Sequence, residues 1–98
     1  MKALKLENSG VTEAEIDNSL EALQAAVDGY IETVRLVPGR AVMIVNEEGL
    51  LRDMPLNTVA SAAAGARIVG PAIVVGVDGE EFTDVPADVA QCVRAMFS

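Results

Sequence analysis

Three polar residues beside two expected turns are the strongest candidates for binding a small ligand. Asn46 and Glu47 directly follow the apolar run 41–45, and Asn57 precedes the alanine-rich run 58–64. Two carboxamides and a carboxylate can hydrogen-bond a ligand, and a helix that begins after Asn57 would attract an anion to its N-terminus. The same residues also have structural uses, because asparagine is common in turns and at helix N-caps. We favour the structural uses.

A second constellation consists of carboxylates at every other position, Glu13, Glu15 and Asp17. Alternate residues of a strand project from one side, so these three would form an acidic strand face. Such a face could engage a protein partner, and regularly spaced carboxylates can also imitate the phosphates of DNA. Its simplest use is solubility, for which net negative charge suffices. Charge at these positions also indicates an edge strand, because it discourages edge-to-edge pairing.

The composition removes most kinds of catalytic site. The 98 residues include no His, no Trp, one Tyr, two Phe and a single cysteine, Cys92. Catalysis by a nucleophile–histidine pair needs an imidazole, and a zinc site needs more Cys or His ligands than one. The carboxylates between Asp78 and Asp88 lack the spacing of a calcium loop, so we expect a solvated acidic turn there. We therefore expect no metal, no cofactor and no enzymatic activity.

The charge balance limits the partners. The 15 acidic and 7 basic residues give a formal net charge of -8, which argues against direct nucleic-acid binding because phosphates need basic residues to neutralise them. No apolar run is long enough to span a membrane, and the first residues become polar too early for a signal peptide. A lone cysteine gives no reason to expect an oxidising compartment. We expect a cytoplasmic protein that contacts neither nucleic acid nor membrane.

The apolar content points to self-association. Hydrophobic residues make up 51% of the chain, and a domain of this length buries only about two-thirds of its unfolded surface. Some of this apolar surface is left over for a partner. We expect a homo-oligomer.

Hydrophobic periodicity predicts a mixture of strands and short helices. A hairpin is expected around the turn 8–10, and further strands at 30–37, 41–45 and 68–77, the last interrupted at Gly70-Pro71. Helices are expected at 19–28, capped by Asn18, at 58–64, capped by Asn57, and after a cap at Thr83 or Asp84. The last helix would bury a stripe of Val89, Val93 and Met96, with Cys92 as a small buried neighbour. This order predicts one α+β domain over 1–98, a largely antiparallel sheet with two to three short helices packed on one face.

Several segments carry a likeness to a known family. They are Met1–Leu6, Leu20–Gln24, Gly29–Glu32, Val45–Gly49, Pro55–Asn57, Ile68–Gly70 and Gly76–Asp84. In this order they resemble domain of unknown function 3846, small proteins of bacteriophages, plasmids and bacteria. The resemblance implies an accessory protein of a mobile genetic element in the bacterial cytoplasm, and it brings no activity with it. Thr58 departs from the basic residue or proline that relatives tend to place there, which weakens an anion-binding role for that loop.

These observations favour a binding protein without a chemical step, one that engages a host factor. A first alternative is a small-ligand binder, for instance a counter-defence protein that sequesters a signalling nucleotide between subunits. A second is an acidic DNA mimic that acts through Glu13, Glu15 and Asp17. The three differ in what they bind, namely a protein, a small molecule or a DNA-binding protein.

Overall fold

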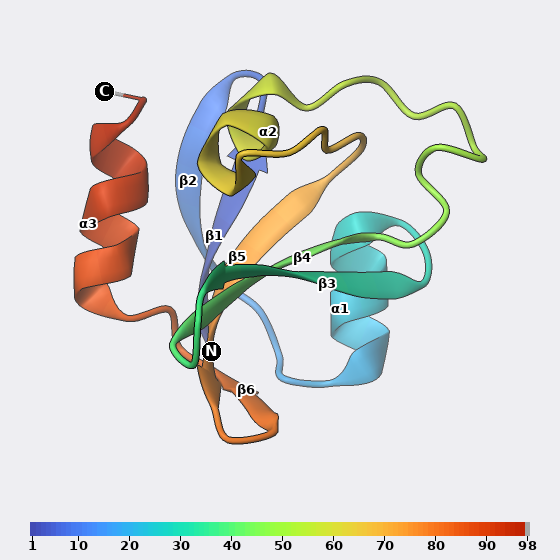
Figure 1. The fold of residues 1–98 in the computed structure, drawn as a ribbon. Coiled ribbons are helices and arrows are strands. Elements are labelled where there is room, and N and C mark those ends of the chain that lie inside the picture. The colour runs from blue at the N-terminus through green and yellow to red at the C-terminus, as the bar shows by residue number, and fades with distance from the viewer. Residues whose placement is uncertain (98) are drawn as a thin grey trace.

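The strand Ala72–Asp78, β5, lies inside a single antiparallel sheet (Figure 1). The computed structural model describes residues 1–97, and over these residues the sheet has six strands. The other strands are β1 (Lys2–Glu7), β2 (Gly10–Glu15), β3 (Ile31–Val37), β4 (Ala41–Asn46) and β6 (Glu81–Thr83). The helices are α1 (Leu20–Val27), α2 (Thr58–Ala64) and α3 (Ala87–Ala95). The strand order is β2-β1-β5-β4-β3, with β6 paired to the C-terminal end of β5, so β2 and β3 form the outer edges.

The predicted hairpin forms, and the expected strands at 30–37 and 41–45 form a second one. β1 and β2 pair from Lys2 opposite Glu15 to Glu7 opposite Gly10, around the expected turn. β3 and β4 pair around a turn in which Gly39 has a φ of 73°, a conformation that glycine adopts without steric strain. β5 begins only after Pro71, because a proline cannot donate a ladder hydrogen bond inside a central strand. The predicted 68–77 strand therefore starts four residues late, at Ala72, and continues to Asp78.

The α+β class is confirmed, but the helices divide between the two faces of the sheet. On β4, Ile44 belongs to the same hydrophobic cluster as Leu23 of α1, whereas its neighbour Met43 belongs to the cluster that contains Val59 of α2 and Val89 of α3. Two helices, α2 and α3, thus share one face, as expected, and α1 covers the other face. Both faces are covered because β4 and β5 are apolar at successive positions, so both sides of the central strands need a cover. None of the three helices within residues 1–97 is long and apolar enough to cross a membrane.

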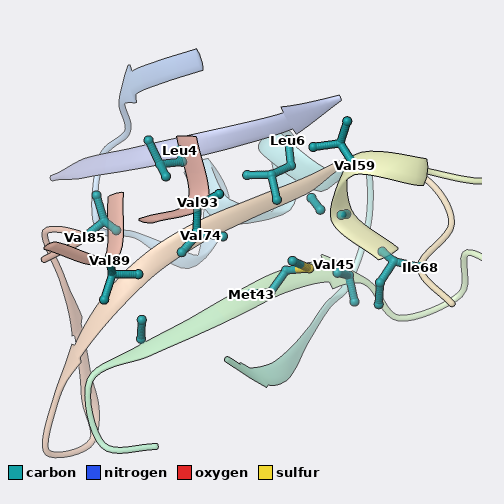
Figure 2. Packing of buried hydrophobic residues seen from close by; sticks show 13 residues of the cluster. Leu4, Leu6, Met43, Val45, Val59, Ile68, Val74, Val85, Val89 and Val93 are labelled. Carbon is teal, nitrogen blue, oxygen red and sulfur yellow. The ribbon is translucent and has the colours of Figure 1, made fainter. Parts of the chain in front are cut away.

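The larger of the two hydrophobic clusters lies between the sheet and the pair α2 and α3 (Figure 2). Leu4 and Leu6 of β1 meet Val74 of β5 there, with Val59 and Val93 contributed by the two helices. All five side chains are buried. Burial of one such side chain stabilises the fold by about 1.5–3 kcal/mol, so this cluster fixes the sheet from which the connecting loops start.

Two helix starts differ from those predicted. Ser19, not Asn18, caps α1, with its hydroxyl accepting a hydrogen bond from the Ala22 amide at 3.1 Å. Asn18 instead donates to the carbonyl of Phe82 at 2.7 Å. This long-range contact is invisible to a rule that considers only the next three residues.

The C-terminal helix also begins later than expected. Thr83 belongs to β6 and the Asp84 carboxylate accepts a hydrogen bond from the Lys2 amide at 2.7 Å, so α3 starts after Pro86. Of its predicted apolar stripe, Val89 and Val93 are buried, but Met96 is exposed. Cys92 is exposed as well, and its expected burial is wrong.

Candidate functional site

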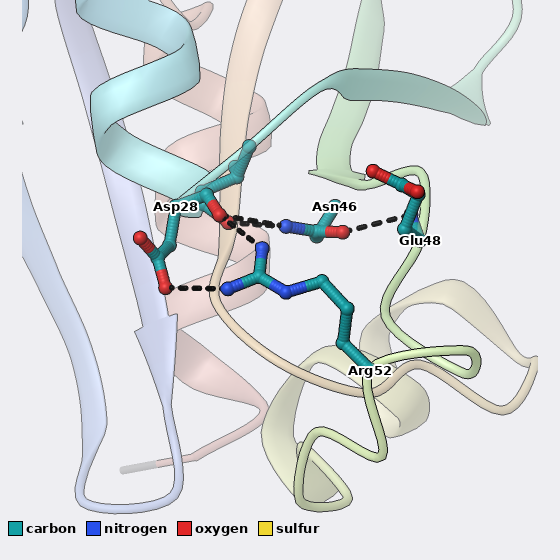
Figure 3. Close-up of polar contacts among 5 residues, drawn as sticks. Asp28, Asn46, Glu48 and Arg52 are labelled. Carbon is teal, nitrogen blue, oxygen red and sulfur yellow. Dashed lines mark hydrogen bonds and ion pairs between the residues drawn. The ribbon is translucent and has the colours of Figure 1, made fainter.

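The end of β4 is held by the buried side chain of Asn46. Its Nδ2 donates to the carbonyls of Val27 at 3.0 Å and Asp28 at 3.1 Å, and its Oδ1 accepts from the Glu48 amide at 2.7 Å (Figure 3). Both amide hydrogens and the carbonyl oxygen of this side chain are therefore engaged within the fold. Asn46 joins the C-terminal end of α1 to the loop that follows β4.

Arg52, farther along the same loop, also contacts the C-terminal end of α1. Its guanidinium donates to the carbonyl of Asp28 and lies 3.2 Å from the Asp28 carboxylate (Figure 3). Asp28 has a φ of 62°, which turns the chain at the end of α1. Its carbonyl oxygen and one carboxylate oxygen both face the arginine. Loop and helix are thus connected twice, through Asn46 and through Arg52.

We call residues 47–53 the tip loop. Its backbone is internally hydrogen-bonded, from Arg52 N–H to Glu48 O at 2.9 Å and from Asp53 N–H to Leu50 O at 3.2 Å. Gly49 is packed against Val69, where an added Cβ would lie 2.8 Å from the Val69 Cγ2 and 3.2 Å from its carbonyl oxygen. The loop is therefore fixed to the body at its base and closed on itself at its end.

Two neighbouring leucines stand at the end of this fixed loop. Leu50 is 72% exposed and Leu51 87% exposed, and Tyr30, whose carbonyl accepts a hydrogen bond from the Glu47 amide, is 62% exposed. In Figure 1 this yellow-green segment reaches away from the sheet. We call Leu50 and Leu51 the leucine tip. The exposure of this pair is not predicted above, although two leucines enclosed between Glu47-Glu48 and Arg52-Asp53 are a signal of it in the sequence.

Asn57 holds the other end of the connection, where α2 begins. Its Oδ1 accepts from the Ala60 amide at 2.9 Å, which confirms the predicted N-cap, and its Nδ2 donates to the carbonyls of Leu6 at 2.8 Å and Gly70 at 3.0 Å. The side chain is buried and joins β1 to the break before β5.

An open groove of about 680 Å³ runs beside Asn57. Its walls include Lys5 on β1, Arg52 in the tip loop, Met54 directly after that loop, and Pro71 before β5. The structure does not gather the three predicted ligand residues in one place. Asn57 lines this groove, whereas Asn46 and Glu47 are not among its lining residues, and the Glu47 side chain points to solvent.

The predicted acidic strand face is partly neutralised. The Glu13 carboxylate lies 3.5 Å from the Arg94 guanidinium of α3, and the Glu15 carboxylate lies 3.5 Å from the amino group of Met1. Asp17 follows the end of β2 and is exposed. Glu13 and Glu15 share the sheet face on which α3 packs, because they are paired with Leu4 and Lys2.

Arg40 and Asp88 tie α3 to the sheet. Two hydrogen bonds of 2.7 and 2.8 Å join the guanidinium to both carboxylate oxygens, and these bonds lower the pKa of Asp88 from 3.8 to about 2. The pair borders a groove of about 310 Å³ between β3 and α3, lined by Leu36, Cys92 and Met96 among others. Asp84 and Asp88 of the acidic stretch 78–88 thus have partners within the fold.

The buried side chains of Asn46 and Asn57 hold the loops, and among the exposed large hydrophobic residues within 1–97 Leu51 and Leu50 are the most exposed. No curated protein and no solved structure matches the chain. The sequence model of one family does match, over residues 1–98, and the chain belongs to this family, which is described as domain of unknown function (DUF3846).

Proposed function

We propose that this protein acts by binding another protein through the leucine tip, without a chemical step. The observation that carries the proposal is the exposure of Leu50 and Leu51, 72% and 87%, on a loop that is fixed to its scaffold. Burial of each leucine in a partner contributes about 1.5–3 kcal/mol. A loop that is already ordered loses less conformational entropy on binding than a flexible one. Loops held by a rigid scaffold are also where binding residues commonly occur.

The surroundings of the tip indicate the kind of partner. Glu47 and Asp53 flank the leucines and are exposed, Glu48 is half-buried, and the Arg52 charge is matched by Asp28. An apolar pair within an acidic rim fits a partner whose apolar pocket has a basic rim, because complementary potentials favour encounter and register. In the setting that the family resemblance implies, a mobile genetic element in bacterial cytoplasm, this partner is a host protein.

Site-specific photo-crosslinking in the bacterial host tests the proposal. A photoreactive residue at position 51 should form one dominant adduct, and the same residue at position 20 should not, although Leu20 on α1 is also 59% exposed. The partner identified in this way is then purified and titrated against the protein by calorimetry. Leu50→Ser combined with Leu51→Ser should weaken binding by at least about tenfold, equivalent to about 1.4 kcal/mol, and Leu20→Ser should not. Identical adducts from both positions, or unchanged affinity of the double variant, would exclude the tip as the binding site.

A second candidate function, binding of a small ligand, is favoured by the groove beside Asn57. Its volume of about 680 Å³ lies within the range of about 300–1,000 Å³ that ligand pockets occupy. Lys5 and Arg52 line the groove together with Glu7, Asp28 and Asp53, and each cation lies close to a carboxylate, Lys5 to Glu7 at 3.6 Å and Arg52 to Asp28 at 3.2 Å. The partly apolar lining therefore offers paired charges, to which a small polar ligand can hydrogen-bond. Native mass spectrometry of protein isolated from its host should then show a retained small-molecule mass. That mass should be lost with Lys5→Ala and kept with Lys2→Ala, a lysine on β1 outside this groove.

A further inference from the structure

The two outer edges of the sheet carry different charges. Among residues 1–97, β2 pairs only with β1 and β3 only with β4, so each presents one unpaired row of backbone N–H and C=O groups. Such rows are templates for another strand unless charge or a cover protects them. The side chains along each edge therefore decide which edge can accept a second chain.

The β2 edge is protected against a copy of itself. Glu13 and Glu15 project from the same face of the sheet, so two β2 edges brought together would collect four carboxylates on one face. Like charges across a strand pair are destabilising. The carboxylates therefore oppose pairing between two β2 strands.

The β3 edge lacks this protection. Its two charged residues, Glu32 and Arg35, have opposite signs and lie on opposite faces, since Glu32 is paired with Val45 and Arg35 with Val42 of β4. The net charge of the edge is zero. The regular part of β3 runs from Ile31 to Arg35, before the irregularity in its pairing with β4.

We propose that β3 pairs antiparallel with β3 of a second copy of this chain and so extends the sheet across a twofold axis. With the axis at Thr33, the threonine lies opposite its own copy and Glu32 lies opposite Val34. With the axis at Val34, Thr33 lies opposite Arg35. Neither register places like charges directly opposite each other, and threonine and valine pairs are favourable between strands.

This interface is separate from the leucine tip. It uses backbone groups of β3, whereas the tip consists of the side chains of Leu50 and Leu51 in the loop after β4. The charge of -8 on each copy opposes association over long distances. Added salt screens this repulsion, so the dimer should become tighter as ionic strength rises.

Sedimentation velocity with two matched variants tests the proposal. The wild-type chain should sediment as a dimer, at twice 10.2 kDa. Thr33→Lys should sediment as a monomer, because either register then places the new ammonium opposite a second lysine or opposite Arg35. Thr12→Lys, on the other edge strand, places its new ammonium opposite Lys5 of the same chain and against no residue of a second copy, so it should stay dimeric. Both lysines make the net charge less negative, so a monomeric Thr33→Lys cannot result from overall repulsion.

Hydrogen exchange on the wild-type chain gives a readout that needs no variant. Backbone amides within 31–35 should exchange more slowly at a concentration where the dimer forms than at one where it is dissociated, and amides of β2 should not change. Circular dichroism confirms that both variants are folded. A wild-type monomer at about 100 µM, where a complex with the micromolar affinity of about -8 kcal/mol would be associated, overturns the proposal. So does a Thr33→Lys protein that dimerises as well as Thr12→Lys.

Discussion

Two buried asparagines position the loops of this protein through both ends of their amide groups. Asn46 accepts from its own loop and donates to the end of α1, and Asn57 caps α2 while donating to Leu6 and Gly70. An aspartate in either place would keep the acceptor and lose the donors. Both positions therefore require an amide, because only an amide provides the two N–H donors as well as the acceptor. At Asn57 the helix cap uses only the acceptor.

Asn57→Ala should be one of the most destabilising single substitutions outside the hydrophobic core. It removes the cap of α2 and the side-chain donor to the carbonyls of Leu6 and Gly70, for an expected loss of about 2–3 kcal/mol in the free energy of unfolding. Urea unfolding measures this loss. Asn8→Ala is the matched control, since the exposed Asn8 also accepts from the first amide of α2 and donates to the Leu56 carbonyl. Equal losses for the two variants would contradict the importance of burial at Asn57.

Whether the role of a single residue can be predicted from the sequence depends on how far along the chain its partner lies. The sequence predicts Asn57 as a cap because the amide that it accepts from is three residues away. It does not predict that the same side chain reaches Leu6, fifty-one residues earlier. Asn18 fails as a cap for the same reason, since its partner, Phe82, is sixty-four residues away. The placement of Asn46 and Glu47 outside the groove beside Asn57 is likewise a property of the whole fold.

At the scale of elements, α3 begins without a side-chain cap and is joined to the sheet by an ion pair. Pro86 occupies its N-cap position and provides no side-chain hydrogen bond. The helix is held instead by the buried Val89 and Val93 and by the pair of Arg40 and Asp88. This pair connects the turn between β3 and β4 to the first turn of the helix.

The tether should make stability depend on pH in acid. The pKa of Asp88 is about 2 in the folded chain against 3.8 without its partner. Because the folded value is depressed, the stabilisation is fully present above about pH 4 and is lost as the pH falls towards 2. Thermal unfolding from pH 7 to pH 2 should therefore show a lower Tm for Arg40→Gln than for wild type, with the difference vanishing near pH 2. Arg67→Gln, an exposed arginine after α2, should show no such convergence. A constant difference at all pH values would assign the effect of Arg40 to packing.

Elements with strong local patterns were predictable, and their placement in space was not. The run 41–45 is continuously apolar, a pattern that predicts a strand covered on both faces, and β4 confirms it. A strand that is covered on both faces implies helices on both sides of the sheet. The irregular order of strands and helices nevertheless led to the expectation that the helices share one face. The sequence has no marker for the insertion of β5 between β1 and β4, because strands far apart along the chain pair there. The tip loop escaped prediction because exposure depends on what the rest of the fold leaves uncovered.

At the scale of the whole molecule, the net charge of -8 affects the two proposed interfaces in opposite directions. A partner with a basic rim is attracted to the tip, so salt should weaken that complex. A second copy is repelled, so salt should strengthen the β3 dimer. The screening length falls from about 10 Å at 0.1 M to about 3 Å at 1 M, and both effects should be evident across this range.

Salt alone does not distinguish the tip from an acidic DNA mimic, since either complex would weaken as ionic strength rises. Glu13→Lys combined with Glu15→Lys separates them, because these carboxylates lie on β2 and form no part of the tip loop. If the partner binds the leucine tip, the charge-reversed protein should bind with nearly the wild-type affinity, while Leu50→Ser with Leu51→Ser should bind poorly. If the protein imitates DNA, the order is reversed. Calorimetric titration of both variants at two salt concentrations therefore identifies which surface carries the binding energy. Sedimentation of the same samples reports whether the dimer tightens as salt is added.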